Sequence, residues 1–337
     1  MRAFVITGPG EASVQDVAPP VAAPGEVIVR VARAGVCGTD VEFYTGGMQY
    51  LHDGFAEYPM RIGHEWAGTV AALGDGVDRR WLGRRVTGDT MLGCGRCRRC
   101  RAGHQWVCEF RTEVGIRGGR PGALAEQLAV PVTALHELPD VVDDTLGALV
   151  EPGGNAYRAV QAAALHPGDR LLVLGPGTIG LLVAMFARAA GAEVHLLGRS
   201  RTALDFEKTL GFDGVWDDST LPSDLPWDAV IDASNAATLP AKALELVEPG
   251  ERVVYIGLAD TPSMIDSRAL VLNDVTAVGI LSASPGLGAT IDAYAAGTVD
   301  PRPLVAAVVG LHELPAVLAG ERPPGSGAGP KFQVAIG

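Results

Sequence analysis

A glycine-rich turn between a predicted strand and a predicted helix constrains the fold more than any other feature. The turn, Gly175–Gly180, reads G-x-G-x-x-G; it follows the apolar run RLLVL and opens the helical run IGLLVAMFARAAG, after which AEVHLLG reads as a second strand. In such a unit the first glycine permits a tight turn, the second lets backbone approach a pyrophosphate, and the third allows close helix–strand packing. Because all three elements are present, the pattern indicates a dinucleotide site rather than a chance glycine turn. Its predicted contacts are Gly175, Gly177, Thr178, Ile179 and Gly180.

The hydrophobic pattern of the rest of the chain differs before and after about Pro152. After about Pro152, the runs WDAVIDAS, ERVVYIG and DVTAVGIL show little alternation, as expected of strands in a parallel sheet covered by helices on both faces. Before it, valine-rich runs between Gly, Pro and Asp clusters indicate an all-β, barrel-like unit: MRAFVIT, EVIVRVARAGV, EWAGTVAALG, RRVTGD and LAEQLAVP. A helix at GLGATIDAYAAG and a final strand KFQVAIG close the sequence. A length of 337 residues fits two domains.

Four of the five cysteines crowd into one short segment, as Cys94, Cys97, Cys100 and Cys108. The spacing C-x2-C-x2-C-x7-C lets four thiolates close a tetrahedral shell around zinc with bonds of about 2.3 Å. A closed shell leaves no position for substrate, so this zinc would be structural. An iron–sulfur cluster is the chemical alternative, and four unrelated cysteines are the non-functional one.

The fifth cysteine, Cys37, lies in AGVCGTD, just past a predicted strand, and His64-Glu65 lies in the turn before the next one. A cysteine, a histidine and a carboxylate suit a zinc ion that keeps an open coordination position. Taken singly, a buried cysteine or histidine is more often a packed residue than a ligand. The three together are a candidate catalytic metal site.

Charge and hydropathy narrow the possible partners. The 39 acidic and 27 basic residues give a net charge of −12, which opposes binding to nucleic acid. The longest apolar stretch, 179–187, falls short of the roughly 20 residues that a spanning helix needs, so we expect no membrane anchor. The N-terminal residues lack a secretory signal, and the clustered cysteines suit a reducing compartment; we therefore expect a cytoplasmic protein.

In this order, the motifs GVCGTD, GHE, CGRCRRC with Cys108, Glu151-Pro152 and GPGTIG resemble the zinc-dependent medium-chain dehydrogenase/reductase (alcohol dehydrogenase) family. RTEVGIRGG and Glu151-Pro152 look most similar to its polyol and glucose dehydrogenase branch. The resemblance implies an α/β protein with a GroES-like β-barrel catalytic domain and a Rossmann doubly wound parallel-sheet domain. We place the catalytic domain at residues 1–151 and 286–337, with its zinc lobe at 94–108, and the Rossmann domain at 152–285.

The resemblance also implies roles for individual residues. Cys37 and His64 would bind the catalytic zinc, with Glu65 or Glu151 and water completing the shell; which carboxylate ligates stays open. Thr39 would relay the substrate proton, and Glu113 would contact substrate hydroxyls, as would Glu151. Leu281 and Ser282 would lie near the nicotinamide. A homodimer or homotetramer assembled through the Rossmann domain is expected.

The end of the second strand of the βαβ unit bears on cofactor choice. NAD-preferring folds place an acidic residue there to accept from the ribose 2′-hydroxyl. This chain instead has Gly198-Arg199-Ser200-Arg201, whose charges and hydroxyl suit a 2′-phosphate. We therefore predict a preference for NADP, with NAD possible. Two surface arginines next to a helix are the alternative explanation.

The expected reaction is hydride transfer between NADP(H) or NAD(H) and the secondary alcohol or ketone of a polyol, sugar or cyclitol-like substrate. Zinc would act as Lewis acid on the substrate oxygen, with two zinc ions per chain in all. An allylic or aromatic alcohol dehydrogenase or aldehyde reductase is the first alternative, although only 6% of the residues are aromatic. A non-catalytic zinc- and nucleotide-binding protein is the second.

Overall fold

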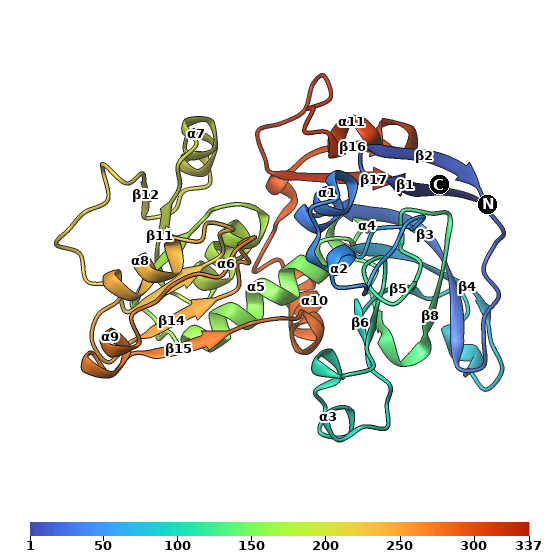
Figure 1. Cartoon of the computed structure of the whole chain (residues 1–337), viewed down its shortest axis with the longest axis horizontal. Helices are drawn as coiled ribbons and strands as arrows, with labels where there is room; N and C mark the ends of the chain where they lie inside the picture. The colour runs from blue at the N-terminus through green and yellow to red at the C-terminus, as the bar shows by residue number, and fades with distance from the viewer. Residues whose placement is uncertain (337) are drawn as a thin grey trace. The chain divides into compact units, whose positions relative to one another are not determined.

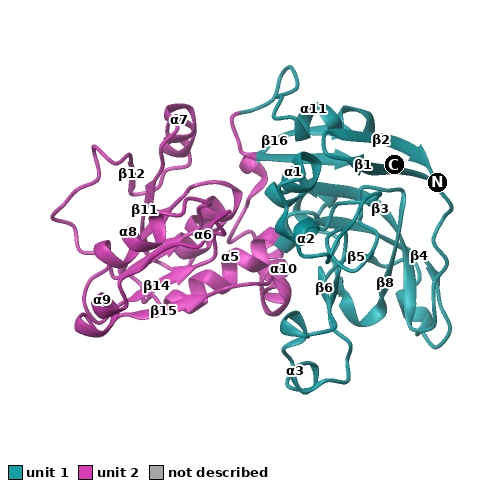
Figure 2. Ribbon diagram, in the orientation of Figure 1, with its two compact units in different colours: residues 1–151, 305–327, 331–337 teal, residues 152–304, 328–330 magenta. Residues whose placement is uncertain are grey.

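The computed structural model describes residues 1–336 and divides into two compact units (Figure 2). Unit 1 comprises residues 1–151, 305–327 and 331–337, and unit 2 comprises residues 152–304 and 328–330. The sequence-based boundary stood at 285/286; by contacts, residues 286–304 group with unit 2. Gly337, the last residue of the predicted strand KFQVAIG, lies outside the described residues.

Unit 1 is built on strands that bring the two ends of the described chain together. Its seven-stranded sheet has the order β16-β17-β3-β4-β5-β9, with β8 paired to β3, and smaller sheets are formed by β1-β2 and β6-β7. In Figure 1 the red strands β16 and β17 accordingly lie in the same unit as the blue strands β1 to β3. The strands are β1 (Arg2–Gly8), β2 (Glu11–Asp16), β3 (Glu26–Val36), β4 (Trp66–Leu73), β5 (Arg85–Gly88), β6 (Met91–Leu92), β7 (Thr112–Glu113), β8 (Gln127–Pro131), β9 (Leu135–Glu137), β16 (Val305–Gly310) and β17 (Lys331–Ala335).

The helices of unit 1 are short and lie in its loops: α1 (Gly38–Thr45), α2 (Gln49–His52), α3 (Arg98–Arg101), α4 (Asp144–Gly147) and α11 (Leu314–Leu318). The apolar faces of the strands enclose one core, which contains the fully buried Phe4, Phe43 and Trp66. The predicted barrel-like unit is confirmed. Strands β2 and β16 and helix α1 were not predicted, because each is short and lacks an extended apolar period.

Unit 2 is a parallel sheet of six strands in the order β12-β11-β10-β13-β14-β15. Numbered from β10, this order is 3-2-1-4-5-6, the doubly wound arrangement that binds dinucleotides at the carboxyl ends of its strands. The predicted α/β class is therefore confirmed. The elements are α5 (Val150–Ala163), which begins at the end of unit 1, and then β10 (Arg170–Leu174), α6 (Thr178–Ala189), β11 (Glu193–Leu197), α7 (Arg201–Thr209), β12 (Gly214–Trp216), β13 (Ala229–Asp232), α8 (Leu239–Leu246), β14 (Arg252–Tyr255), α9 (Ser267–Leu272), β15 (Thr276–Gly279) and α10 (Leu287–Ala295).

The central strands of unit 2 are apolar on both faces. Leu171 to Leu174 of β10 are fully buried, as are Ala229 to Ile231 of β13. Helix α6 packs against β10 and β11 and buries most of its own length. Among the described residues, no helix is both long enough and apolar enough to cross a membrane.

Candidate functional site

Cys37, His64 and Glu65 converge in unit 1. Each offers one ligand atom, and these atoms lie within 4.8 Å of one another. Cys37 directly follows β3, and His64-Glu65 directly precede β4; the two strands are antiparallel neighbours, with Ala34 opposite Trp66. Strand pairing thus brings together residues that are well separated in sequence.

Asp40 braces this cluster from the first turn of α1. Its carboxylate accepts hydrogen bonds from the backbone N–H of Cys37 at 2.9 Å and of Gly63 at 3.1 Å. Its Oδ1 also lies 3.9 Å from Nδ1 of His64. Burial raises the pKa of Asp40, which is fully enclosed. Asp40 is the last residue of the motif GVCGTD, and no role for it was predicted from the sequence.

The surroundings of His64 are rich in negative charge. Burial alone would lower its pKa, but a hydrogen bond to Cys37 and the charges of Cys37, Asp40 and Glu151 raise it well above the ordinary value. Nδ1 of His64 is buried and has no hydrogen-bond partner. A thiol, an imidazole and a carboxylate form the mixed donor set of zinc sites that keep an open position. The residues therefore fit a zinc ion.

Glu65 is held by a lysine from the other end of the chain. Nζ of Lys331, in β17, lies 2.6 Å from Oε1 of Glu65 and also donates to the carbonyl oxygen of Val36 at 2.8 Å. Gly35 leaves room for this carboxylate, because a Cβ there would lie 1.9 Å from Oε2 of Glu65. Sequence reasoning missed Lys331, which carries no local signal beyond being a charge inside a short apolar strand.

The other candidates, Glu151, Thr39 and Glu113, are not members of this group. Glu151, in the first turn of α5, is not in the 4.8 Å group, although its charge reaches His64. The side chain of Thr39 is half-buried, two residues beyond Cys37. Glu113 is buried and accepts a hydrogen bond from Nε of Arg111 at 2.7 Å, with the hydroxyl of Tyr50 at 3.5 Å.

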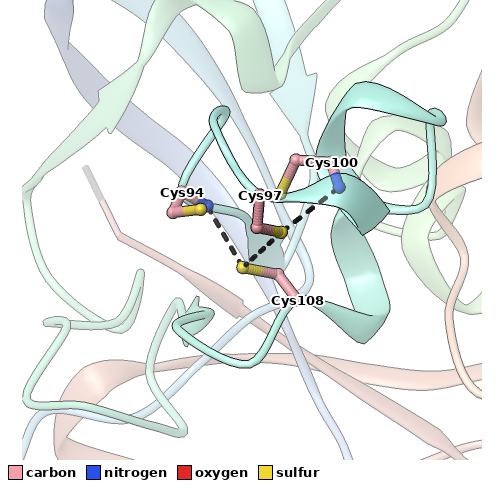
Figure 3. Close-up of side chains that lie close together, drawn as sticks. All are labelled: Cys94, Cys97, Cys100 and Cys108. Carbon is pink, nitrogen blue, oxygen red and sulfur yellow. Dashed lines mark hydrogen bonds between the residues drawn. The ribbon is translucent and has the colours of Figure 1, made fainter.

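The four clustered cysteines also converge (Figure 3). Sγ of Cys97 lies 3.7 Å from Sγ of Cys108, which matches the edge of about 3.8 Å expected for a sulfur tetrahedron with zinc bonds of about 2.3 Å. The backbone N–H of Arg96 lowers the pKa of Cys94 to about 6, and the N–H of Cys100 lowers that of Cys97. Burial raises the pKa of Cys100 to about 12. The lobe fits a metal that takes four sulfurs.

In unit 2 the three glycines of the turn have three different environments. Gly175 has φ +78°, and a Cβ there would lie 2.6 Å from the side chain of Ser234. A Cβ at Gly177, directly before α6, would meet no described atom within 4 Å, whereas one at Gly180 would lie 2.4 Å from the carbonyl oxygen of Gly175. The turn is therefore crowded at Gly175 and Gly180 and open at Gly177. Thr178 and Ile179, which follow Gly177, begin the helix. This fits a pyrophosphate at the helix N-terminus.

The loop after β11 carries Gly198, Arg199, Ser200 and Arg201. Gly198 is buried against Pro176 of the glycine-rich turn, and both arginines are exposed. Oγ of Ser200 accepts a hydrogen bond from the backbone N–H of Ala203 at 3.4 Å and so begins α7.

Leu281 and Ser282 follow β15 and differ in exposure. Leu281 is 43% exposed and Ser282 is 4% exposed. The carbonyl oxygen of Ser282 accepts a hydrogen bond from Arg158, and its hydroxyl contacts that of Ser284 at 3.2 Å. Hydrogen bonds therefore hold both the carbonyl group and the side chain of Ser282.

Comparison with known proteins agrees with this arrangement. Residues 23–140 match the alcohol dehydrogenase GroES-like domain, and residues 178–295 match the zinc-binding dehydrogenase domain. The chain is 30% identical over 280 residues to L-threonine 3-dehydrogenase of Rhizobium etli, covering 79% of each. A structure from Sinorhizobium meliloti 1021 solved with bound NADP superimposes with a TM-score of 0.89 at 27% identity, covering 99% of this chain and 98% of that one. Alcohol dehydrogenase from Thermus sp. ATN1 gives 0.89 at 26% identity over the whole of both chains.

Fold, donor sets and comparisons together define a zinc-dependent oxidoreductase that uses a nicotinamide dinucleotide. The chain belongs to the zinc-dependent medium-chain dehydrogenase/reductase family of alcohol dehydrogenases. It is accordingly an enzyme that acts on a small-molecule substrate.

Proposed function

We propose that the enzyme transfers a hydride between the secondary alcohol or ketone of a polyol, sugar or cyclitol-like substrate and NADP(H), with NAD(H) as the weaker alternative. The single observation that carries the proposal is the convergence of Cys37, His64 and Glu65 within 4.8 Å. This donor set leaves zinc a free coordination position for an oxygen ligand.

Cys37 and His64 would hold the zinc, with Glu65 or Glu151 as the carboxylate that completes or exchanges in the shell. When bound, zinc supplies a Lewis acid for the substrate oxygen. Lys331 neutralises Glu65 and keeps it beside the other two ligands. Glu151, whose charge raises the pKa of His64, is the second candidate carboxylate.

Thr39 would accept the substrate proton. Its hydroxyl makes no hydrogen bond with any described residue, so it is free to donate and accept at the first turn of α1. Glu113 would accept from a further substrate hydroxyl, because Arg111 and Tyr50 fix its carboxylate in one position. Leu281 and Ser282 would present backbone to the nicotinamide.

We assign a second zinc to Cys94, Cys97, Cys100 and Cys108, which gives two per chain. Its role would be structural, since four thiolates close the tetrahedron. Four reduced thiols also favour a reducing compartment such as the cytoplasm.

The NADP preference rests on Arg199 and Arg201. Both are exposed, neither has an ion-pair partner among the described residues, and no carboxylate ends β11. The hydroxyl of Ser200 can still donate, because its bond to Ala203 uses only an acceptor position. These groups suit a 2′-phosphate next to Gly198.

Assembly would proceed through unit 2, as a homodimer or homotetramer. Strand β15 forms one edge of the sheet, and Val271 and Leu272 of the preceding helix are 80% and 76% exposed. An unpaired edge flanked by exposed apolar side chains is a template for pairing with a second chain. Light scattering should give a dimer or larger that Leu272→Glu weakens and Val141→Glu, in unit 1, does not. A stable monomer at micromolar concentrations contradicts this assembly.

The L-threonine 3-dehydrogenase relatives favour a second candidate, oxidation of the secondary alcohol of L-threonine. The deciding experiment is a dehydrogenase screen over polyols, aldoses, cyclitols and L-threonine with both cofactors. Turnover of a polyhydroxylated substrate with kcat/KM well above that for L-threonine supports the proposal. The reverse ranking selects the second candidate, and no turnover of any of them contradicts both.

A further inference from the structure

Unit 1 contains a cavity of about 380 Å³ whose lining includes none of the residues assigned above to substrate or cofactor. Its apolar lining includes Val5 of β1, Val17 directly after β2, Met60 before β4 and Ile116 after β7. None of the described metal-site candidates lines it. The volume lies at the lower end of the range of about 300–1,000 Å³ typical of small-molecule sites.

The lining also contains three arginines, Arg61, Arg117 and Arg120, and one acidic residue, Glu57. Arg120 is already paired: Nη2 lies 2.6 Å from Oε1 of Glu26 and 2.9 Å from the carbonyl oxygen of Ala129. Its Nε, however, is buried without a hydrogen-bond partner. Because this Nε is enclosed by protein atoms, it does not face the cavity, and the charge of Arg120 is already balanced by Glu26.

The other two guanidinium groups have no carboxylate partner. Arg61 is half-buried, burial lowers its pKa, and its guanidinium makes no hydrogen bond or ion pair with any described residue. The guanidinium carbon of Arg117 lies 3.7 Å from the ring centroid of Phe55, which orients it without neutralising it. The lining of the cavity therefore carries two positive charges without an ion-pair partner and the single negative charge of Glu57, in a chain whose net charge is −12.

We propose that this cavity binds a small organic anion, a carboxylate or phosphate ester attached to an apolar body. Planar guanidinium groups match both anions through paired N–H donors, and the four apolar side chains would contact the body. A second cavity of about 70 Å³ shares Arg61 and Arg120. At about 30 Å³ per water molecule, this second cavity has room for only about two water molecules. It could therefore hold water bound to the anion, but not the apolar part of the ligand.

The proposal is independent of the dehydrogenase assignment. The test therefore uses the zinc-loaded full chain saturated with NADP, so that the dinucleotide site is filled. Isothermal titration calorimetry measures binding of phenyl phosphate, benzoate and inorganic phosphate. We expect saturable binding of phenyl phosphate or benzoate, with inorganic phosphate weaker because it lacks the apolar body; the better of the two organic probes distinguishes ester from carboxylate.

Substitutions of lining residues then test whether the probe binds in this cavity. Arg61→Gln and Arg117→Gln should each weaken the better organic probe by about tenfold, the usual effect of losing a charge-assisted hydrogen bond. Glu57→Gln should tighten it by about two- to threefold, since it removes the only repelling charge. Arg98→Gln, an exposed arginine of the zinc lobe, is the matched control and should leave affinity unchanged. Zinc content is measured for each variant, because Arg61 lies three residues before His64.

Three results would contradict the proposed anion site. If no organic probe binds the wild-type chain at millimolar concentration, or if Arg61→Gln and Arg117→Gln with intact zinc bind it as tightly as wild type, the cavity is not an anion site. Equal affinity for inorganic phosphate and phenyl phosphate would remove the apolar body from the proposal and so overturn it as stated.

Discussion

The ammonium group of Lys331 lies 2.6 Å from Oε1 and 2.5 Å from Oε2 of Glu65, and both side chains are only 2% exposed. Removing one member of a buried ion pair leaves an uncompensated charge, at a cost of about 3–5 kcal/mol. Lys331→Met should therefore lower the free energy of unfolding by about that amount, measured by denaturant titration of zinc-loaded protein. Lys331→Arg, which keeps the charge, should lose much less. A Met variant as stable as wild type would show that the pair contributes nothing.

Cys37→Ser should lower kcat at least tenfold, which corresponds to a barrier increase of about 1.4 kcal/mol or more. The reason is that the substitution removes a proposed zinc ligand in unit 1, whereas the glycine-rich turn in unit 2 is untouched. Affinity for NADP, measured by fluorescence titration, should stay within about twofold, a change of less than about 0.5 kcal/mol. A kcat above a tenth of the wild-type value would contradict the proposed role of Cys37 as a metal ligand.

Metal analysis of protein purified without chelator should return close to two zinc ions per chain. Chelation should remove activity before it removes the second ion, because an open three-ligand site exchanges faster than a closed shell of four thiolates. Cys108→Ser should reduce the zinc count to one and lower the unfolding temperature, since Cys108 is buried at the centre of the lobe. One zinc in the wild-type chain would refute the two-site assignment.

Arg199→Ala and Arg201→Ala should each shift the ratio of kcat/KM for NADP and NAD towards NAD. A charge pair at about 4 Å contributes about 4 kcal/mol before desolvation and screening, so a net preference of about 1–3 kcal/mol is expected. Arg268→Ala, an exposed arginine elsewhere in unit 2, is the control and should leave the ratio unchanged. If the wild-type enzyme prefers NAD, and neither substitution changes the kcat/KM ratio, then this loop does not bind the 2′-phosphate of NADP.

Glu207 should make the stability of the protein depend on pH near neutrality. Both oxygens of this carboxyl group in α7 are buried without a hydrogen-bond partner, and burial raises its pKa from 4.5 to about 7. The folded state therefore favours the protonated form, and stability is lost as the pH rises from about 4.5 through about 7, by at most about 3 kcal/mol.

Glu207→Gln tests this sign directly. The variant should be more stable than wild type at pH 8, and the gain should shrink on lowering the pH to 5, as measured by denaturant titration at each pH. Glu245→Gln, an exposed position on α8, is the matched control and should show no such gain. A gain for Glu207→Gln that is equal at both pH values would rule out titration of Glu207 as the cause.

The features that sequence reasoning found are those encoded by local spacing. Gly175, Gly177 and Gly180 have distinct steric roles within one turn, and four cysteines in a single lobe are recognisable for the same reason. Both β3 and β4 were recognisable as strands, and their antiparallel pairing brings Cys37 to His64.

Features that depend on remote parts of the chain were not predictable in this way. Lys331 is buried because β17 pairs antiparallel with β3, a contact between residues far apart in sequence. Its strand is short, and a lone lysine there has the same local pattern as a surface charge. The role of Asp40 likewise depends on the position of Gly63, which the carboxylate contacts only after β3 and β4 have paired.

The long interval between Glu65 and Lys331 affects how the enzyme is made. Their sequence separation is 266 residues, and at about 5–20 residues per second a ribosome needs some tens of seconds to cover it. During that time Glu65 has no lysine to neutralise it, although Cys37 and His64 have already been synthesised. We therefore expect the proposed metal site to be complete only after β17 has emerged. A nascent chain stalled before Lys331 should present a thiol, an imidazole and a carboxylate without its lysine to any available metal ion.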